Sequence, residues 1–141
     1  MGTDSGAITL FSFEGKSGNF AMVQVQCEKF GKTGVRRVVP GQYVTAEPKG
    51  RAIMVAAVEK QKLVYVMNRD NAGRTTISSP LEAHKSSTIT FDVKAVDVGF
   101  DNPVFAALEL SYAEADAEGT KEAAENATKQ LTYYEVRAGA K

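Results

Sequence analysis

Four short stretches of this sequence place apolar side chains on both faces of an extended strand: residues 52–58, 63–67, 104–110 and 131–136. A strand on a protein surface alternates apolar and polar side chains, so a run that is apolar at successive positions belongs to a sheet that is covered on both sides. The runs are too short for buried helices, and Gly, Pro and Asn residues separate them. The expected fold class is therefore all-β, with sheets stacked face to face.

Weaker strand signals surround these four runs, at residues 7–13, 20–30, 43–47, 75–85 and 89–98. The first two predict a hairpin around a turn at 15–19. Pro80 interrupts the fourth, which predicts a ragged outer strand, because proline cannot donate a ladder hydrogen bond. In the fifth, the apolar phase shifts at Val96, which predicts a bulge or a bend.

The second half of the chain repeats the first: Val44 aligns with Val96, residues 52–58 with 104–110, and residues 63–67 with 131–136. The repeated unit is an inner strand, two buried strands and a ragged outer strand. In the second copy the buried strands are separated by an Ala- and Glu-rich insertion, 112–130, in which residues 121–129 form either a short helix or a loop. Four-stranded units with doubly apolar middle strands are typical of β-propeller blades, which pack against a neighbour on either side.

The sequence thus predicts an incomplete propeller of about two to two and a half blades with WD40-like four-stranded sheets. Residues 4–30 are expected to end one blade, 43–85 to form a full blade, and 86–136 to form most of the next. The side chains expected between blades are Met54, Val64, Val66, Phe105 and Leu108.

Charge and cysteine content exclude several function classes. The chain has 17 basic and 17 acidic residues, so no global field favours nucleic acid or an anionic membrane, although residues 1–90 carry net +5 and 91–141 net −5. Cys27 is the single cysteine and His84 the single histidine, too few for a disulfide or a zinc site. The lack of a signal peptide pattern or a long apolar run predicts an intracellular protein without a membrane anchor.

Two short motifs resemble phosphate-binding loops, at residues 15–17 and 31–33, but both lack the required earlier glycine, since Leu10 and Gln26 occupy its place. A small hydrolase or nucleotide-binding enzyme would rest on these motifs and on His84, whose expected role is structural. The basic stretch from Lys29 to Arg37 is interpreted as a solvated or protein-facing loop in preference to an RNA site. No catalytic, cofactor-binding or metal-binding residue is predicted, and no cofactor.

Several runs of side chains carry a specific resemblance, and they occur in this order: Arg36-Arg37-Val38-Val39-Pro40-Gly41-Gln42, Pro48-Lys49-Gly50-Arg51-Ala52, Glu59-Lys60-Gln61-Lys62-Leu63-Val64-Tyr65, Asn68-Arg69-Asp70, Thr76-Ile77-Ser78-Ser79-Pro80-Leu81-Glu82-Ala83-His84-Lys85, Val96-Asp97-Val98-Gly99-Phe100-Asp101-Asn102-Pro103, Glu114-Ala115-Asp116 and Leu131-Thr132-Tyr133-Tyr134-Glu135. The chain resembles the third subunit of splicing factor 3b, a family of very large triple-propeller scaffolds. The resemblance covers residues 29–136, is loose over 4–13 and is absent over 14–28. Paralogous scaffolds for DNA damage binding and for polyadenylation specificity share the architecture and are the alternative.

The resemblance implies a non-enzymatic, protein-binding scaffold of the nucleus, in the complex that helps to select the intron branch point. It implies the HEAT-repeat subunit and a very small subunit of splicing factor 3b as partners, indirect or weak contact with nucleic acid, and no membrane.

The expected partner-binding surface is one end of the blades. In a propeller, the loops between consecutive blades and between a blade's two middle strands emerge at the same end; here they are 31–42, 59–62, 79–87 and 112–130. Binding residues concentrate on loops that a rigid scaffold positions. The candidate residues are Lys32, Arg36, Arg37, Lys60, Lys62, Glu114 and Asp116.

Overall fold

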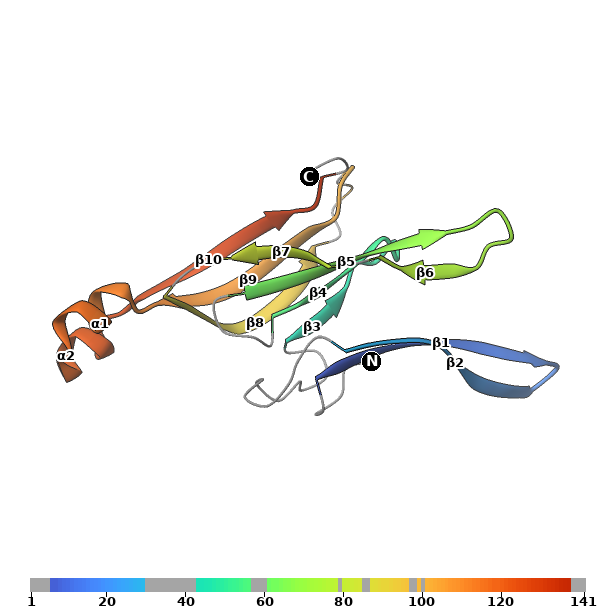
Figure 1. Ribbon diagram of the computed structural model, residues 1–141, viewed down its shortest axis with the longest axis horizontal. Coiled ribbons are helices and arrows are strands. Elements are labelled where there is room, and N and C mark those ends of the chain that lie inside the picture. Colours follow the sequence, from blue (N-terminus) through green and yellow to red (C-terminus); the bar gives the residue numbers. More distant parts are fainter. Residues whose placement is uncertain are drawn as a thin grey trace.

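The computed structural model describes residues 6–29, 43–56, 61–78, 80–84, 87–96, 99 and 101–137, and these residues form mainly antiparallel strands (Figure 1). The strands are β1 (Ala7–Lys16), β2 (Asn19–Lys29), β3 (Val44–Ala46), β4 (Ala52–Val55), β5 (Gln61–Arg69), β6 (Thr75–Ile77), β7 (Leu81–His84), β8 (Thr88–Val96), β9 (Val104–Ser111) and β10 (Thr128–Glu135). Two short helices, α1 (Ala113–Glu118) and α2 (Lys121–Glu125), lie between β9 and β10. The predicted all-β class is confirmed.

The strands form three sheets: β1-β2, β3-β4-β5 extended by β6 and β7, and β8-β9-β10. Both β6 and β7 pair with β5, β6 at residues 67–69 and β7 at residues 61–64. The ragged outer strand around Pro80 is thus confirmed as two short strands. Ser78 lies between them and bonds the backbone of Val66 twice, through its own N–H and its side-chain oxygen.

The predicted repeat is visible in the pairing order, since β3-β4-β5 and β8-β9-β10 both run outward from an inner strand (Figure 1). The inner strands of the two sheets meet where Ala95 N–H donates to Thr45 Oγ1 at 3.3 Å. Between the sheets lies a core of seven buried side chains: Ala52, Met54, Ala56, Val64, Val93, Phe105 and Ala107. Small alanines facing Met54 and Phe105 let the two sheets approach closely.

A second core covers the other face of the middle sheet. Ile8 and Leu10 of β1 pack with Tyr43, Val55 and Tyr65, and the cluster is completed by Val44, Ile53, Leu63 and Ile77. The middle sheet is therefore covered on both sides, which is why residues 52–55 and 63–65 are apolar at successive positions.

One of the five predicted core residues is wrong. Met54, Val64 and Phe105 are buried as expected and Val66 is half-buried, but Leu108 is 45% exposed. Successive side chains of a strand point to opposite faces, so Phe105 points toward the middle sheet and Leu108 away from it. Because both faces of β9 are apolar, the sequence could not show which face was covered.

One further expectation needs correction. The bulge in β8 lies between Thr90 and Asp92, ahead of the predicted shift at Val96, and it turns Phe91 outward.

Of the two alternatives left open for residues 121–129, a short helix is found, α2 at Lys121–Glu125, and a second helix, α1, precedes it. Gly119 ends α1 in the left-handed region at φ 66°, and Thr120 caps α2 by accepting a hydrogen bond from Ala123 N–H.

Candidate protein-interaction site

The strand ends that border the predicted loops 59–62 and 112–130 lie together at one end of the molecule, whereas residues 81–84 of the predicted loop 79–87 form the strand β7. Gln61 at the start of β5 pairs with His84 at the end of β7, and Thr88 and Thr128 both pair with Ser111 at the end of β9. Tyr112 N–H donates to the carbonyl oxygen of Ser87 at 2.9 Å. The helices α1 and α2 project beyond this end, which we call the loop end (Figure 1).

The acidic half of the predicted surface is exposed at the loop end. Glu114 and Asp116 lie on α1 with exposed side chains, and three more exposed carboxylates follow, those of Glu118, Glu122 and Glu125. Between Glu114 and Glu125 the sequence has one cation, Lys121, whose Nζ lies 3.5 Å from Glu125 Oε1. The helical insertion therefore presents a net negative surface to solvent.

The basic half stays a prediction. Lys32, Arg36, Arg37 and Lys60 lie outside the described residues.

Lys62 is not a surface residue, so its place in the predicted interface is wrong. Its side chain is 3% exposed, and its ammonium group forms an ion pair with Glu109, which is fully buried. Lys62 belongs to β5 and points into the space between the middle sheet and the β8-β9-β10 sheet. It therefore joins the two sheets instead of meeting a partner protein.

Glu109 is the centre of a buried polar cluster. Three side chains of β10 donate to its carboxylate: the Tyr134 hydroxyl at 2.5 Å, the Thr132 hydroxyl at 2.7 Å and the Gln130 amide at 3.3 Å. With Lys62, both carboxylate oxygens are satisfied, which a buried charge requires. The cluster holds β5, β9 and β10 in one arrangement.

Tyr134 is held in its neutral form by this environment. Burial raises the pKa of its phenol well above the usual value of 10.0, and the hydrogen bond to Glu109 raises the pKa further. The Lys62 ammonium also lies 5.0 Å from the centre of the Tyr134 ring, within the range of a cation–π contact. Tyr134 therefore keeps its proton across the ordinary pH range and donates a hydrogen bond to Glu109.

The sequence carried a signal for this cluster that the charge-based prediction did not use. Glu109 interrupts an otherwise apolar run. In the next strand, the side chains that can donate a hydrogen bond recur at every second residue, and therefore share one face: Gln130, Thr132 and Tyr134. A carboxylate in the middle of a doubly apolar strand must find partners inside the protein. Lys62, next to the apolar run at 63–67, was the available cation.

A second charged contact joins the two sheets at the end opposite the loop end. Arg51 donates to Glu47 Oε1 at 2.7 Å and to the carbonyl oxygen of Asp101 at 2.5 Å. The hydrogen bonds from Arg51 hold the pKa of the buried Glu47 carboxyl below its ordinary value. The turns 47–51 and 101–103 are thereby fixed to one another.

No group of three potential metal ligands occurs among the residues that the structure describes. In that same part of the chain, no helix is long and apolar enough to cross a membrane.

The middle sheet packs against the β1-β2 sheet on one face and the β8-β9-β10 sheet on the other, as successive propeller blades do, and the family comparison agrees. Residues 1–141 match the family model described as the RSE1/DDB1/CPSF1 first beta-propeller, so the chain belongs to this family. The match includes residues 14–28, where the resemblance was expected to be absent.

Similar full-length proteins are named as splicing factors. The chain is 56% identical to Spliceosome-associated protein 130 A of Arabidopsis thaliana and 53% identical to Splicing factor 3B subunit 3 of Drosophila melanogaster, in each case over 99% of this chain. It is 50% identical to Pre-mRNA-splicing factor prp12 of Schizosaccharomyces pombe over 97% of this chain. The chain spans 11% of the length of each of these relatives.

Proposed function

We propose that this chain forms part of a non-enzymatic propeller scaffold in the splicing factor 3b complex and acts in branch-point selection in the nucleus. The observation that carries the proposal is identity of 50–56% over nearly the whole chain to proteins named for pre-mRNA splicing. The paralogous scaffolds of DNA repair and 3′-end processing share the family model, but these similar proteins bear splicing names.

The end faces of the described sheets support the scaffold proposal. Leu108, Leu131 and Tyr133 are exposed on the outer face of the β8-β9-β10 sheet, and Phe13 and Phe20 are exposed near the tip of the β1-β2 hairpin. Contiguous exposed apolar surface marks a place where another protein surface packs. In a propeller, these are the faces that neighbouring blades cover.

We assign the blades accordingly. Residues 4–30 end one blade, 43–85 form a full blade and 86–136 form most of the next, with 112–130 as an insertion at the loop end. The partners proposed for the assembled scaffold are the HEAT-repeat subunit and the very small subunit of splicing factor 3b, with nucleic acid contacted weakly or indirectly.

Charge reversal in the predicted basic loop 31–42 tests this function. In the full-length protein, the Arg36→Glu/Arg37→Glu variant is expected to bind the other splicing factor 3b subunits more weakly and more slowly, with a nearly unchanged melting temperature. Co-purification and association rates at two salt concentrations measure the effect. The control is Lys16→Glu/Lys49→Glu, an equal change of charge on exposed residues away from the loop end. Retained binding together with unfolding of the Arg36/Arg37 variant would show that the two arginines are structural.

A further inference from the structure

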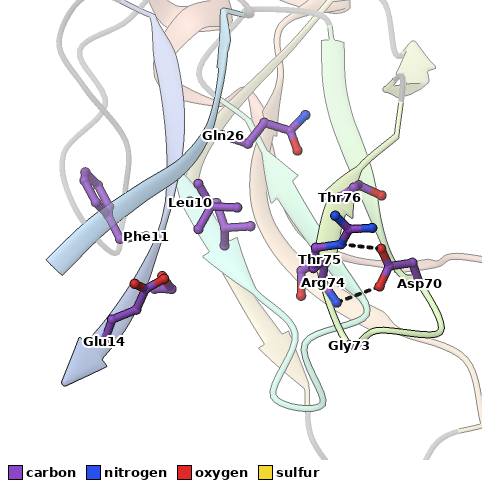
Figure 2. Close-up of a pocket in the computed structure, with 11 residues that line it drawn as sticks. Leu10, Phe11, Glu14, Gln26, Asp70, Gly73, Arg74, Thr75 and Thr76 are labelled. Carbon is purple, nitrogen blue, oxygen red and sulfur yellow. Dashed lines mark hydrogen bonds and ion pairs between the residues drawn. The ribbon is translucent and has the colours of Figure 1, made fainter. Parts of the chain in front are cut away.

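A groove of about 690 Å³ separates the β1-β2 hairpin from the β5-β6 hairpin. Figure 2 shows Leu10 and Gln26 pointing from the hairpin strands toward the side where Arg74, Thr75 and Thr76 lie, while Phe11 points the other way. The volume is in the range of sites that hold a small ligand, roughly 300–1,000 Å³. The β5-β6 hairpin, which forms one wall, lies at the opposite side of the molecule from α1 and α2 (Figure 1).

One wall of the groove is the edge of a sheet. Ser78 N–H bonds to the carbonyl of Val66, and Asp70 N–H bonds to the carbonyl of Arg74, so these pairs are the hydrogen-bonded ones in the β5-β6 ladder. Antiparallel pairing alternates between bonded and non-bonded pairs. The N–H and C=O groups of Thr75 and Ile77 therefore point away from β5, toward the hairpin.

The hairpin already satisfies one of these two residues. The Gln26 side-chain oxygen accepts a hydrogen bond from Ile77 N–H at 2.9 Å. The Gln26 side-chain nitrogen donates a longer hydrogen bond, of 3.5 Å, to the Ile77 carbonyl oxygen. Gln26 itself is held by the Glu28 carboxylate at 2.5 Å. A side-chain amide thus occupies the position that a peptide group of an added strand would take. Thr75, two residues along the same edge, faces the open groove.

The charges on the groove walls favour a cationic occupant. The Asp70 carboxylate is bonded to Arg74 at 2.7 Å and to two backbone N–H groups, so both charges of this pair are engaged. Glu14, on the opposite wall, accepts a hydrogen bond from the Ser12 hydroxyl, and within the described ranges no cation is paired with it. Leu10 and Val25 supply apolar surface between the two walls.

We propose that this groove binds an extended peptide segment of a partner protein, which adds to the β6 edge at Thr75. Main-chain hydrogen bonds to the edge supply affinity, and alternate side chains supply specificity. The segment carries β-branched residues that contact Leu10 and Val25, and a lysine or arginine that meets Glu14. The proposal is independent of the loop-end surface, so either can fail without the other.

Fluorescence anisotropy with a labelled hexapeptide, acetyl-TVRVTV-amide, tests the proposal on the 141-residue chain. The hexapeptide is expected to bind. Two copies are compared with it, one N-methylated at the odd and one at the even positions, and the copy whose methyl groups face the β6 edge is expected not to bind, because N-methylation blocks pairing with a strand edge. Thr75→Pro removes the edge N–H and is expected to weaken binding about three- to tenfold. Glu14→Gln is expected to weaken it about two- to fivefold, and the same change at Glu122 on α2 to leave it unaltered.

Three results would overturn the proposal. The first is that the hexapeptide does not bind. The second is that both N-methylated copies, odd and even, bind as well as the hexapeptide. The third is that the hexapeptide binds the 141-residue chain but not the full-length protein. The last result would mean that a segment of the same protein fills the groove. Because N-methylation leaves the protein untouched, the test stands even if Thr75→Pro fails to fold. Co-purification of the splicing factor 3b subunits with the Glu14→Gln variant separates this result from the proposed function.

Discussion

Replacing Lys62 by methionine is expected to lower the free energy of unfolding by about 3–5 kcal/mol, because Glu109 would remain buried with its charge uncompensated. The side chains are similar in length, so the loss reflects charge more than volume. Urea denaturation of the two proteins measures the difference. The matched control is Lys94→Met, which removes an exposed ion pair with Asp92 and is expected to cost about 0–1 kcal/mol.

A double-mutant cycle separates the pair from its surroundings. The variant Lys62→Met/Glu109→Leu removes both charges and is expected to be less destabilised than the sum of the two single variants. Additive losses would show that Lys62 and Glu109 do not interact in solution.

Truncating Phe105 to alanine is expected to cost about 3–5 kcal/mol, since the ring is fully buried in the core between the middle sheet and the β8-β9-β10 sheet. Leu108→Ala, on the same strand but on its exposed face, is the matched control and is expected to cost far less. Urea midpoints and their slopes measure both. Equal losses, or a larger loss for Leu108, would mean that the two faces of β9 are assigned the wrong way round.

Alternation of side chains predicted most of the strands and the repeat correctly. The runs at 52–58 and 63–67 could be recognised because consecutive apolar residues in so short a segment fit a strand covered on both faces better than a helix. Pro80 located the break between β6 and β7 for a steric reason that holds in any sheet. The family resemblance was confirmed, and it extends further toward the N-terminus than the recognised runs of side chains.

The errors at Lys62 and Leu108 have one physical cause, since both concern which neighbour a side chain meets. Lys62 was predicted to be exposed because it belongs to a charged stretch, and nothing local shows that Glu109 lies across from it. Leu108 was predicted to be buried because an apolar side chain gives no information on whether its face is covered. Both assignments depend on contacts between residues that are distant in the sequence.

The outer face of the β8-β9-β10 sheet explains the exposure of Leu108. Leu131 pairs directly with Leu108, and Tyr133 pairs with Ala106, so the exposed apolar side chains form a continuous band across β9 and β10. We infer that this band is a blade-packing face. A protein that leaves such a face uncovered is expected to associate with itself.

Sedimentation velocity of the 141-residue chain over a range of concentrations tests most directly whether the chain is an incomplete propeller. The wild-type chain is expected to self-associate as concentration rises, because its apolar end faces are uncovered. The Leu131→Lys/Tyr133→Lys variant, which changes only exposed side chains of β10, is expected to associate less at equal concentration. A wild-type chain that sediments as a compact monomer at every concentration, and unfolds in one cooperative step, would contradict the incomplete propeller.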